Sequence, residues 1–260
     1  MNGVSKLFLL QLLPFVFAAL FINAGCKTLN KNSSALSQKN DSLNDCEEAR
    51  HIAYAITNFS LDTPFLSAIS QIKERVRKDP GHEHTVSFGR DSLNEVILST
   101  WNTGSRSSGR VLDIENAFAD LHNHPNNTPP SSGDLYNLLR NHLRNRRYTM
   151  RFILTTGGSL YAFAVTDTAA ADRFLINYPA QQLPGYSPLF PDALLDEYRE
   201  IHQRYGAPEE LAMAYLLEKY NVGVTLLKQS AKGNFRKLRA KMFLTRGEKS
   251  FTAVHCPDKE

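Results

Sequence analysis

The sequence has little cysteine and no large excess of charge of either sign. Its 260 residues include only three cysteines, and none of them shows the Cys-x-x-Cys spacing of cysteine-based metal sites or redox pairs. The formal net charge is +4, and its basic residues are spread out, whereas nucleic-acid-binding proteins concentrate them on one face. We find no internal repeat. We therefore expect an ordinary globular protein with no nucleic-acid partner.

The N-terminus carries the pattern of a secretory leader. Lys6 precedes an apolar segment from Leu7 to Ile22, and small or polar residues follow it up to Cys26. The segment is shorter than the ~20 residues that cross a bilayer as a helix, so we expect a cleaved signal peptide at 1–25. Ala24-Gly25-Cys26 resembles the lipobox of bacterial lipoproteins, which implies attachment to a membrane of the bacterial cell envelope through lipidated Cys26. Ordinary signal cleavage is the alternative.

The residues that follow the leader favour a tether. Residues 26–60 begin with a stretch rich in Ser, Asn and Lys and without apolar periodicity, and a short helix is predicted from Cys46 to Thr57. Cys46 and Cys256 are the two remaining cysteines. They can pair in an oxidising compartment or stay separate, because sequence alone does not show whether they approach each other.

The central part of the chain alternates helical and strand patterns. Apolar residues recur at helical spacing after Thr63-Pro64, and strand-like segments, a second helix and a hairpin follow. The predicted ranges are 63–79 and 131–147 for the helices, and 85–88, 95–100, 117–122, 151–155 and 160–165 for the strands. This order predicts an α/β fold with a mixed sheet flanked by helices.

Beyond residue 180 the composition shifts to proline-rich turns and further helical patterns, at 192–205 and 208–220, with two possible strands at 222–227 and 237–244. We interpret 181–260 as a largely helical C-terminal extension of unknown role. A run of basic residues lies in the second predicted helix and just after that helix. These residues form either a solvated helix face or a surface for an anionic partner: Arg140, His142, Arg144, Arg146, Arg147 and Arg151.

Two histidines and an aspartate indicate a metal site. His122 and His124 end an apolar strand and leave it on the same face, so their rings can converge on one ion. Asp134 lies at the start of the next helix and is the natural third ligand of a catalytic zinc, which needs three protein ligands and an open position. Ser131 and Asp134 also match a capping box, which is the purely structural alternative.

The pattern His-x-His-Pro, a short loop, and then Ser-x-x-Asp resembles the signature of the JAMM (JAB/MPN) metallopeptidases. The resemblance covers about 61–180, and it implies a deaminase-like three-layer core with Zn²⁺ on His122, His124 and Asp134. It also implies that Ser131 holds the oxyanion of the tetrahedral intermediate. Because the loop is one residue shorter than the family's, Ser132 is the alternative for this role.

The same resemblance implies a general base upstream of the histidines. Glu83 lies between the first predicted helix of the core and the following strand, where the family places its glutamate, and Glu95 is the reserve candidate. The implied reaction is hydrolysis of a peptide or isopeptide bond by water that zinc polarises and Glu83 deprotonates. The expected partners are therefore a peptide or protein substrate and the membrane.

Two other functions compete with this interpretation. Asp120-Leu121-His122-Asn123-His124 also resembles the opening motif of polymerase-and-histidinol-phosphatase-type phosphoesterases, but the chain after it is short for the ~250-residue barrel of that class. The second alternative is a non-catalytic envelope lipoprotein that uses the fold as a binding module. Zinc content and the effect of Glu83→Gln on hydrolysis separate an enzyme from such a module.

Overall fold

The computed structural model describes residues 31–106, 109–184 and 187–254, with side chains from Cys46 onward. The predicted leader, the lipidation site Cys26 and Cys256 lie outside these residues, so the structure does not test them. No helix in the described ranges combines the length and apolar character needed to span a bilayer. The chain divides into two units at Asn40/Asp41, and everything from Asp41 on forms one compact unit.

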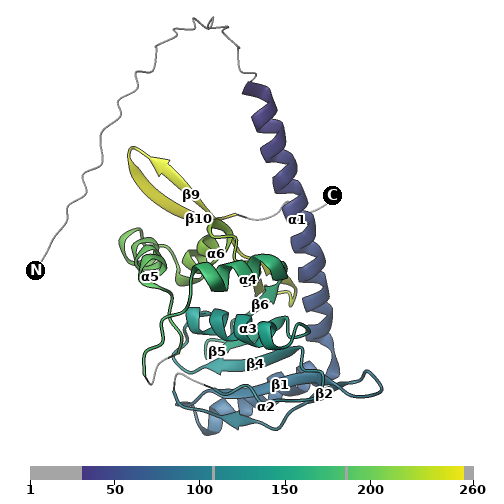
Figure 1. Cartoon of the computed structure of the whole chain (residues 1–260). Helices are drawn as coiled ribbons and strands as arrows, with labels where there is room; N and C mark the ends of the chain where they lie inside the picture. Colours follow the sequence, from purple (N-terminus) through teal and green to yellow (C-terminus); the bar gives the residue numbers. More distant parts are fainter. Residues whose placement is uncertain (1–30, 107–108, 185–186, 255–260) are drawn as a thin grey trace, which may run out of the picture. The chain divides into compact units, whose positions relative to one another are not determined.

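Six α-helices and one π-helical turn make up the helical elements of the described residues (Figure 1). Their bounds are α1 Lys31–Leu61, α2 Thr63–Lys78, α3 Ser132–Arg144, α4 Thr168–Asn177, α5 Asp192–Arg199, η1 Glu200–Arg204 and α6 Glu209–Lys219. Helix α1 begins within the segment that the composition favoured as a tether. The stretch from Lys31 to Leu61 contains neither proline nor glycine, so no residue in it interrupts a helix.

An eight-stranded mixed sheet forms the centre of the compact unit. Its strands are β1 His84–Arg90, β2 Val96–Leu98, β3 Asn102–Thr103, β4 Ala119–His124, β5 Met150–Thr155, β6 Leu160–Val165, β7 Val224–Gln229 and β8 Phe235–Lys237. The order is β2-β1-β4-β5-β6-β7-β8, with β3 also paired to β1. Only β4 and β5 run parallel, and α3 connects them. A separate hairpin consists of β9 Arg239–Thr245 and β10 Glu248–Val254.

Helices cover both faces of the sheet. On one face, Phe65 and Ile72 of α2 pack against Phe88, Phe152 and neighbouring sheet residues, together with Ile56 of α1. On the other face, α3, α4 and α6 bury their apolar sides against alternate residues of β5, β6 and β7 (Figure 1). Since successive side chains of a strand point to opposite faces, each strand contributes to both cores.

The predicted α/β class with a mixed sheet and flanking helices is confirmed. The segment 181–260 contains helices, but it also supplies β7 and β8 to the main sheet, where β7 pairs with β6 along Val165↔Val224 to Tyr161↔Lys228. The fold of the compact unit therefore draws on this segment directly.

Candidate metal centre

The two histidines of the His-x-His motif lie at the end of strand β4. His122 and His124 are 1% and 6% exposed, and their Nε2 atoms are only 3.2 Å apart. Because they are two residues apart in a strand, both rings leave β4 on the same face. This is the face that α3 covers, since Ala119 and Leu121, which precede His122 and point to the opposite face of β4, belong to the core under α2.

The third side chain comes from the first turn of α3. Ser131 is the N-cap, its Oγ accepts a hydrogen bond from the backbone N–H of Asp134, and the Asp134 carboxylate accepts one from the backbone N–H of Ser131. The capping box predicted from the sequence is therefore present. It fixes the carboxylate at the N-terminus of α3, where the helix dipole stabilises negative charge.

The same carboxylate faces both rings. Oδ1 of Asp134 lies 2.9 Å from His122 Nε2, and Oδ2 lies 3.2 Å from His124 Nε2. One atom from each of the three side chains lies within 4.8 Å of the others, so this buried group can hold a metal ion. Two imidazole nitrogens and one carboxylate oxygen are a ligand set that zinc accepts. The prediction that these three residues meet is confirmed.

The second nitrogen of each ring faces a protein acceptor. His124 Nδ1 is 2.9 Å from the backbone oxygen of Thr128, and a proton on Nδ1 that donates to this carbonyl would leave Nε2 for an ion. His122 Nδ1 lies 3.6 Å from Oδ1 of Asp120, and both atoms are buried without a closer partner among the described residues. Asp120 is thus the outer partner of the His122 ring.

Asp120 belongs to a buried polar network behind the cluster. The Tyr148 hydroxyl donates to Oδ2 of Asp120. The Arg151 guanidinium lies 3.6 Å from both Asp120 and Asp134. Arg151 is 2% exposed, and its pKa is raised by the two carboxylates despite the opposing effect of burial. No sequence pattern predicted this role for Asp120, Tyr148 or Arg151, although Asp120 lies two residues before His122 and so on the same face of β4.

The charged groups of the cluster favour positive charge at its centre. Burial raises the pKa of Asp134, but the two imidazoles outweigh this effect and hold the pKa well below its usual range. Burial and Arg151 lower the pKa of His122, and Asp134 and Asp120 outweigh both and raise it to about 9. Two carboxylates around one ring thus favour a cation between them, either a proton or a metal ion.

Glu83 lies beside this group. Register in the sheet explains its position: Thr85 of β1 pairs with His122 of β4, so the residue two before Thr85 is level with His124. Glu83 is 7% exposed, and burial raises the pKa of its carboxyl, with the neighbouring imidazoles acting in the opposite direction. A carboxyl with a raised pKa is suited to accept and return a proton near neutrality.

Asn123 holds the backbone on both sides of Glu83. Its side-chain oxygen accepts from the backbone N–H of His84 at 2.8 Å, and its side-chain nitrogen donates to the carbonyl of His82 at 3.1 Å. The middle residue of the His-x-His motif therefore ties β4 to the segment that carries Glu83. The sequence analysis assigned this residue no role.

Glu95, the reserve candidate for the base, is exposed in the turn that precedes β2. Its backbone N–H donates to Asp91, and the residue lines none of the cavities described here. Ser132, the alternative to Ser131, donates from its hydroxyl to the carbonyl of Pro188 at 3.4 Å. The Ser131 hydroxyl instead donates to Oδ2 of Asp134 at 2.7 Å, which places it at the cluster.

A cavity of about 230 Å³ opens onto the cluster. Its lining includes Glu83, His124 and Ser131, together with Arg106, Thr128 and Pro188. The general-base candidate, one metal-ligand candidate and the serine hydroxyl thus border the same space. In a comparison with known proteins, no family model and no curated protein matches the chain.

Proposed function

We propose that this chain is a zinc-dependent hydrolase of peptide or isopeptide bonds, with a JAMM-type core. The observation that carries the proposal is the common cavity onto which Glu83, His124 and Ser131 open, next to the buried group of His122, His124 and Asp134. An ion site built only for structure needs no open cavity and no buried carboxyl beside it.

The residues of the cluster fit a zinc ion. His122 and His124 offer Nε2 and Asp134 offers a carboxylate oxygen, and the carboxylates of Asp134 and Asp120 on the two sides of the His122 ring favour a cation at this position. Three protein ligands leave one position of a tetrahedral ion for a solvent molecule or a substrate. When bound, zinc supplies a Lewis acid that polarises a carbonyl oxygen and lowers the pKa of water from 15.7 toward ~7.

The chain's own groups then have distinct tasks. Glu83 accepts the proton of the attacking water and returns it to the leaving amine. The hydroxyl of Ser131, at the N-terminus of α3, donates a hydrogen bond to the oxyanion. Thr128 and Asp120 orient the two imidazoles, and Asn123 keeps Glu83 in line with His124. Lipidation at Cys26 would hold the enzyme at a membrane of the bacterial envelope.

The test combines metal content with hydrolysis of a mixed peptide and isopeptide library. We expect about one zinc per chain, and release of new amines that stops when a chelator removes the metal. Glu83→Gln keeps the metal and lowers kcat by roughly 10²–10⁴-fold, the usual contribution of a general base.

Glu95→Gln is the matched control, because this glutamate is exposed and lies in a turn away from the cavity. It should leave both zinc content and hydrolysis unchanged. Stoichiometric zinc without hydrolysis of any substrate in the library would refute the enzyme and favour a binding module. Equal losses in the two variants would refute the role of Glu83.

A further inference from the structure

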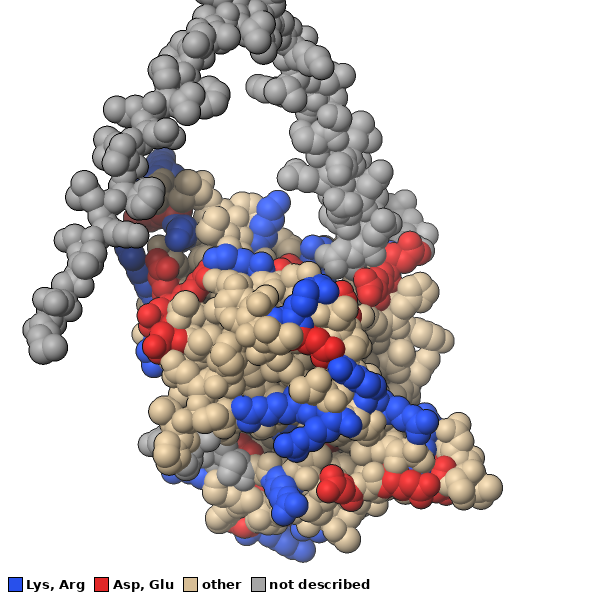
Figure 2. Space-filling model, viewed as in Figure 1, with Lys and Arg blue, Asp and Glu red and all other residues tan. Residues whose placement is uncertain are grey.

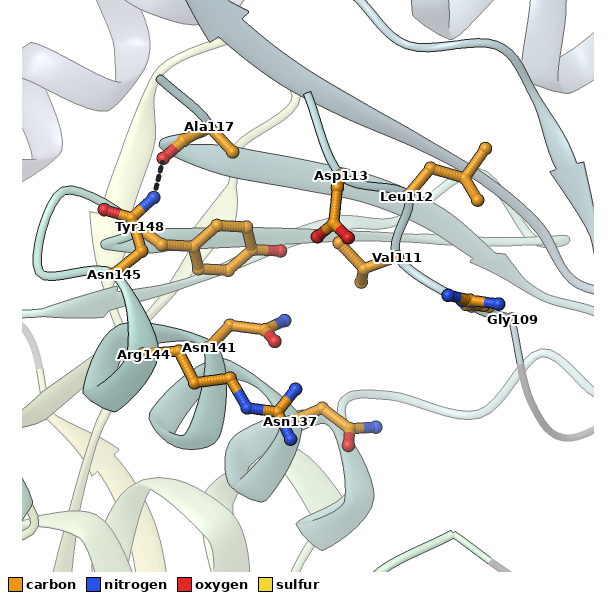
Figure 3. A pocket seen from close by; sticks show the side chains of 11 residues that line it. Gly109, Val111, Leu112, Asp113, Ala117, Asn137, Asn141, Arg144, Asn145 and Tyr148 are labelled. Atoms are coloured by element: carbon orange, nitrogen blue, oxygen red, sulfur yellow. Dashed lines mark hydrogen bonds between the residues drawn. The ribbon is translucent and has the colours of Figure 1, made fainter. Parts of the chain in front are cut away.

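A second cavity lies on the same side of the sheet, between α3 and the segment that precedes β4. Its volume is about 340 Å³, within the ~300–1,000 Å³ of small-ligand sites. One wall is a stripe of α3, since Asn137, Asn141 and Arg144 are four and three residues apart. The other wall is the segment 109–113 with the carboxylate of Asp113. Figure 3 shows Asp113 across the space from the α3 side chains.

This cavity adjoins the candidate metal centre at Gly109. A Cβ atom built on Gly109 would lie 3.5 Å from Oε2 of Glu83. The backbone of Gly109 is therefore close to the Glu83 carboxyl. At the far end, the side-chain nitrogen of Asn145 donates to the carbonyl of Ala117 at 2.8 Å, as the dashed line in Figure 3 marks. A short chain segment in this cavity would therefore have one end beside the general-base candidate.

Two guanidinium groups line this cavity, those of Arg110 and Arg144. Among the described residues, no salt bridge involves either of them. By contrast, the guanidinium of Arg146, two residues after Arg144, forms a bidentate salt bridge with Asp172 at 2.8 and 2.9 Å. Lys and Arg side chains gather over α3 in Figure 2. A guanidinium that is not already paired with a carboxylate of its own protein can bind a carboxylate of a ligand through two hydrogen bonds.

The remaining groups of the lining match a peptide. Side-chain amides such as those of Asn137 and Asn141 both donate and accept, as the peptide groups of a ligand do. Asp113 provides an acceptor for the N–H groups of such a ligand. We propose that this cavity is the substrate subsite of the proposed hydrolase and that it selects a short acidic peptide segment.

The inference rests on the proposed function only where it calls the bound peptide a substrate. Peptide binding is therefore measured separately from hydrolysis. The zinc-loaded full chain is titrated by calorimetry with N-acetyl-triglutamyl amide and with the matched triglutaminyl amide, and mass spectrometry verifies that the peptides stay intact. We expect the acidic peptide to bind at least tenfold more tightly, and added salt to reduce this preference.

Arg144→Gln is expected to reduce the preference for the acidic peptide about tenfold, since a charge-assisted hydrogen bond is lost. Arg146→Gln is the matched control at the same helix end and should leave the preference unchanged, because its charge is paired with Asp172. Both positions are exposed, so thermal unfolding should verify that each variant folds. Asn141→Leu should weaken the binding of both peptides alike.

Equal affinity for the two peptides would overturn the proposal, as would an equal loss in Arg144→Gln and Arg146→Gln. Tighter binding of an oligonucleotide of the same charge would overturn it in favour of nucleic acid. If the library is hydrolysed but the acidic peptide does not bind, the subsite fails and the hydrolase stands. If the peptide binds and no substrate is hydrolysed, the hydrolase fails and the binding site stands.

Discussion

Single side chains around the candidate metal centre each make two kinds of interaction. Oδ2 of Asp134 closes the capping box of α3 and also faces His124, while Oδ1 of the same carboxylate faces His122. Ser131 is both the N-cap and a hydroxyl on the cavity. Such double use makes simple alanine variants hard to interpret, because they lower stability and activity together.

The two contributions of Ser131 can be separated by choosing the substitution. Glycine is tolerated at an N-cap at a cost of only a few tenths of a kcal/mol, whereas alanine costs about 1 kcal/mol. We expect Ser131→Gly to keep the unfolding free energy nearly unchanged and to lower kcat by about 10²–10³-fold, the usual effect of losing an oxyanion donor. Ser132→Ala, with its hydroxyl directed to Pro188, should retain full kcat. A larger loss in Ser132→Ala than in Ser131→Gly would reverse the assignment.

Asn123 provides a second prediction at this scale. Asn123→Ala removes the two hydrogen bonds to the backbone around Glu83 and leaves the buried N–H of His84 without its partner. We expect a loss of about 1–3 kcal/mol in unfolding free energy, a lower kcat and an unchanged zinc content. The pH dependence of kcat should also shift, since the environment of Glu83 changes. An unchanged pH profile together with a lower stability would reduce Asn123 to a structural role.

At the scale of elements, strand pairing and short connections determine where the side chains of the candidate site meet. The antiparallel pairing of β1 with β4 brings Glu83 level with His124, and the loop from Pro125 to Pro130 returns the chain to the N-terminus of α3. A further connection joins the C-terminal part of the chain to this core. The carbonyl of Gly223, just before β7, accepts from the backbone N–H groups of Thr166 and Asp167 at the start of α4.

Gly223 is required there by both conformation and space. Its φ is +71°, and a Cβ on it would lie 2.2 Å from the carbonyl oxygen of Asp167. Gly158, in the hairpin between β5 and β6, has a φ of +84° but nothing within 4 Å of a Cβ. We expect Gly158→Ala to cost about 1 kcal/mol through the backbone conformation alone, and Gly223→Ala to cost about 3 kcal/mol or more. Chemical denaturation measures both, and equal costs would contradict the close packing at Gly223.

At the scale of the whole molecule, the strands of the main sheet determine how much of the chain is needed for folding. The resemblance to JAMM peptidases covers about 61–180, but β7 and β8 extend the sheet from β6, and the apolar side of α6 lies in the core next to α3 and α4. Removal of the segment after residue 180 would expose this core and the edge of β6, which promotes aggregation.

Two truncated chains test this unit. A chain that ends at residue 180 should be insoluble or lack a cooperative unfolding transition. A chain from Asp41 to Glu260 should unfold cooperatively at nearly the same temperature as the full chain, because these residues form the compact unit. Cooperative folding of the chain that ends at 180 would show that β7, β8 and α6 are accessory.

Local features of the sequence were sufficient for many elements and for the ligand group. Apolar periodicity predicted α2, α3 and the β5–β6 hairpin, with differences of a few residues at their ends, because these signals act within a few turns or along one strand. The His-x-His spacing and the capping box placed three candidate ligands at the two ends of one loop, so their meeting follows from local geometry.

Only the tertiary structure decided which residues distant in sequence lie beside His122, His124 and Asp134. The position of Glu83 against His124 depends on the register of β1 and β4, and the outer partners Tyr148 and Arg151 come from the turn before β5 and from β5 itself. The cavity between α3 and the segment before β4 has no sequence signal at all. Pairing register and side-chain packing between elements remote in sequence are cooperative properties of the whole sheet, and no short pattern encodes them.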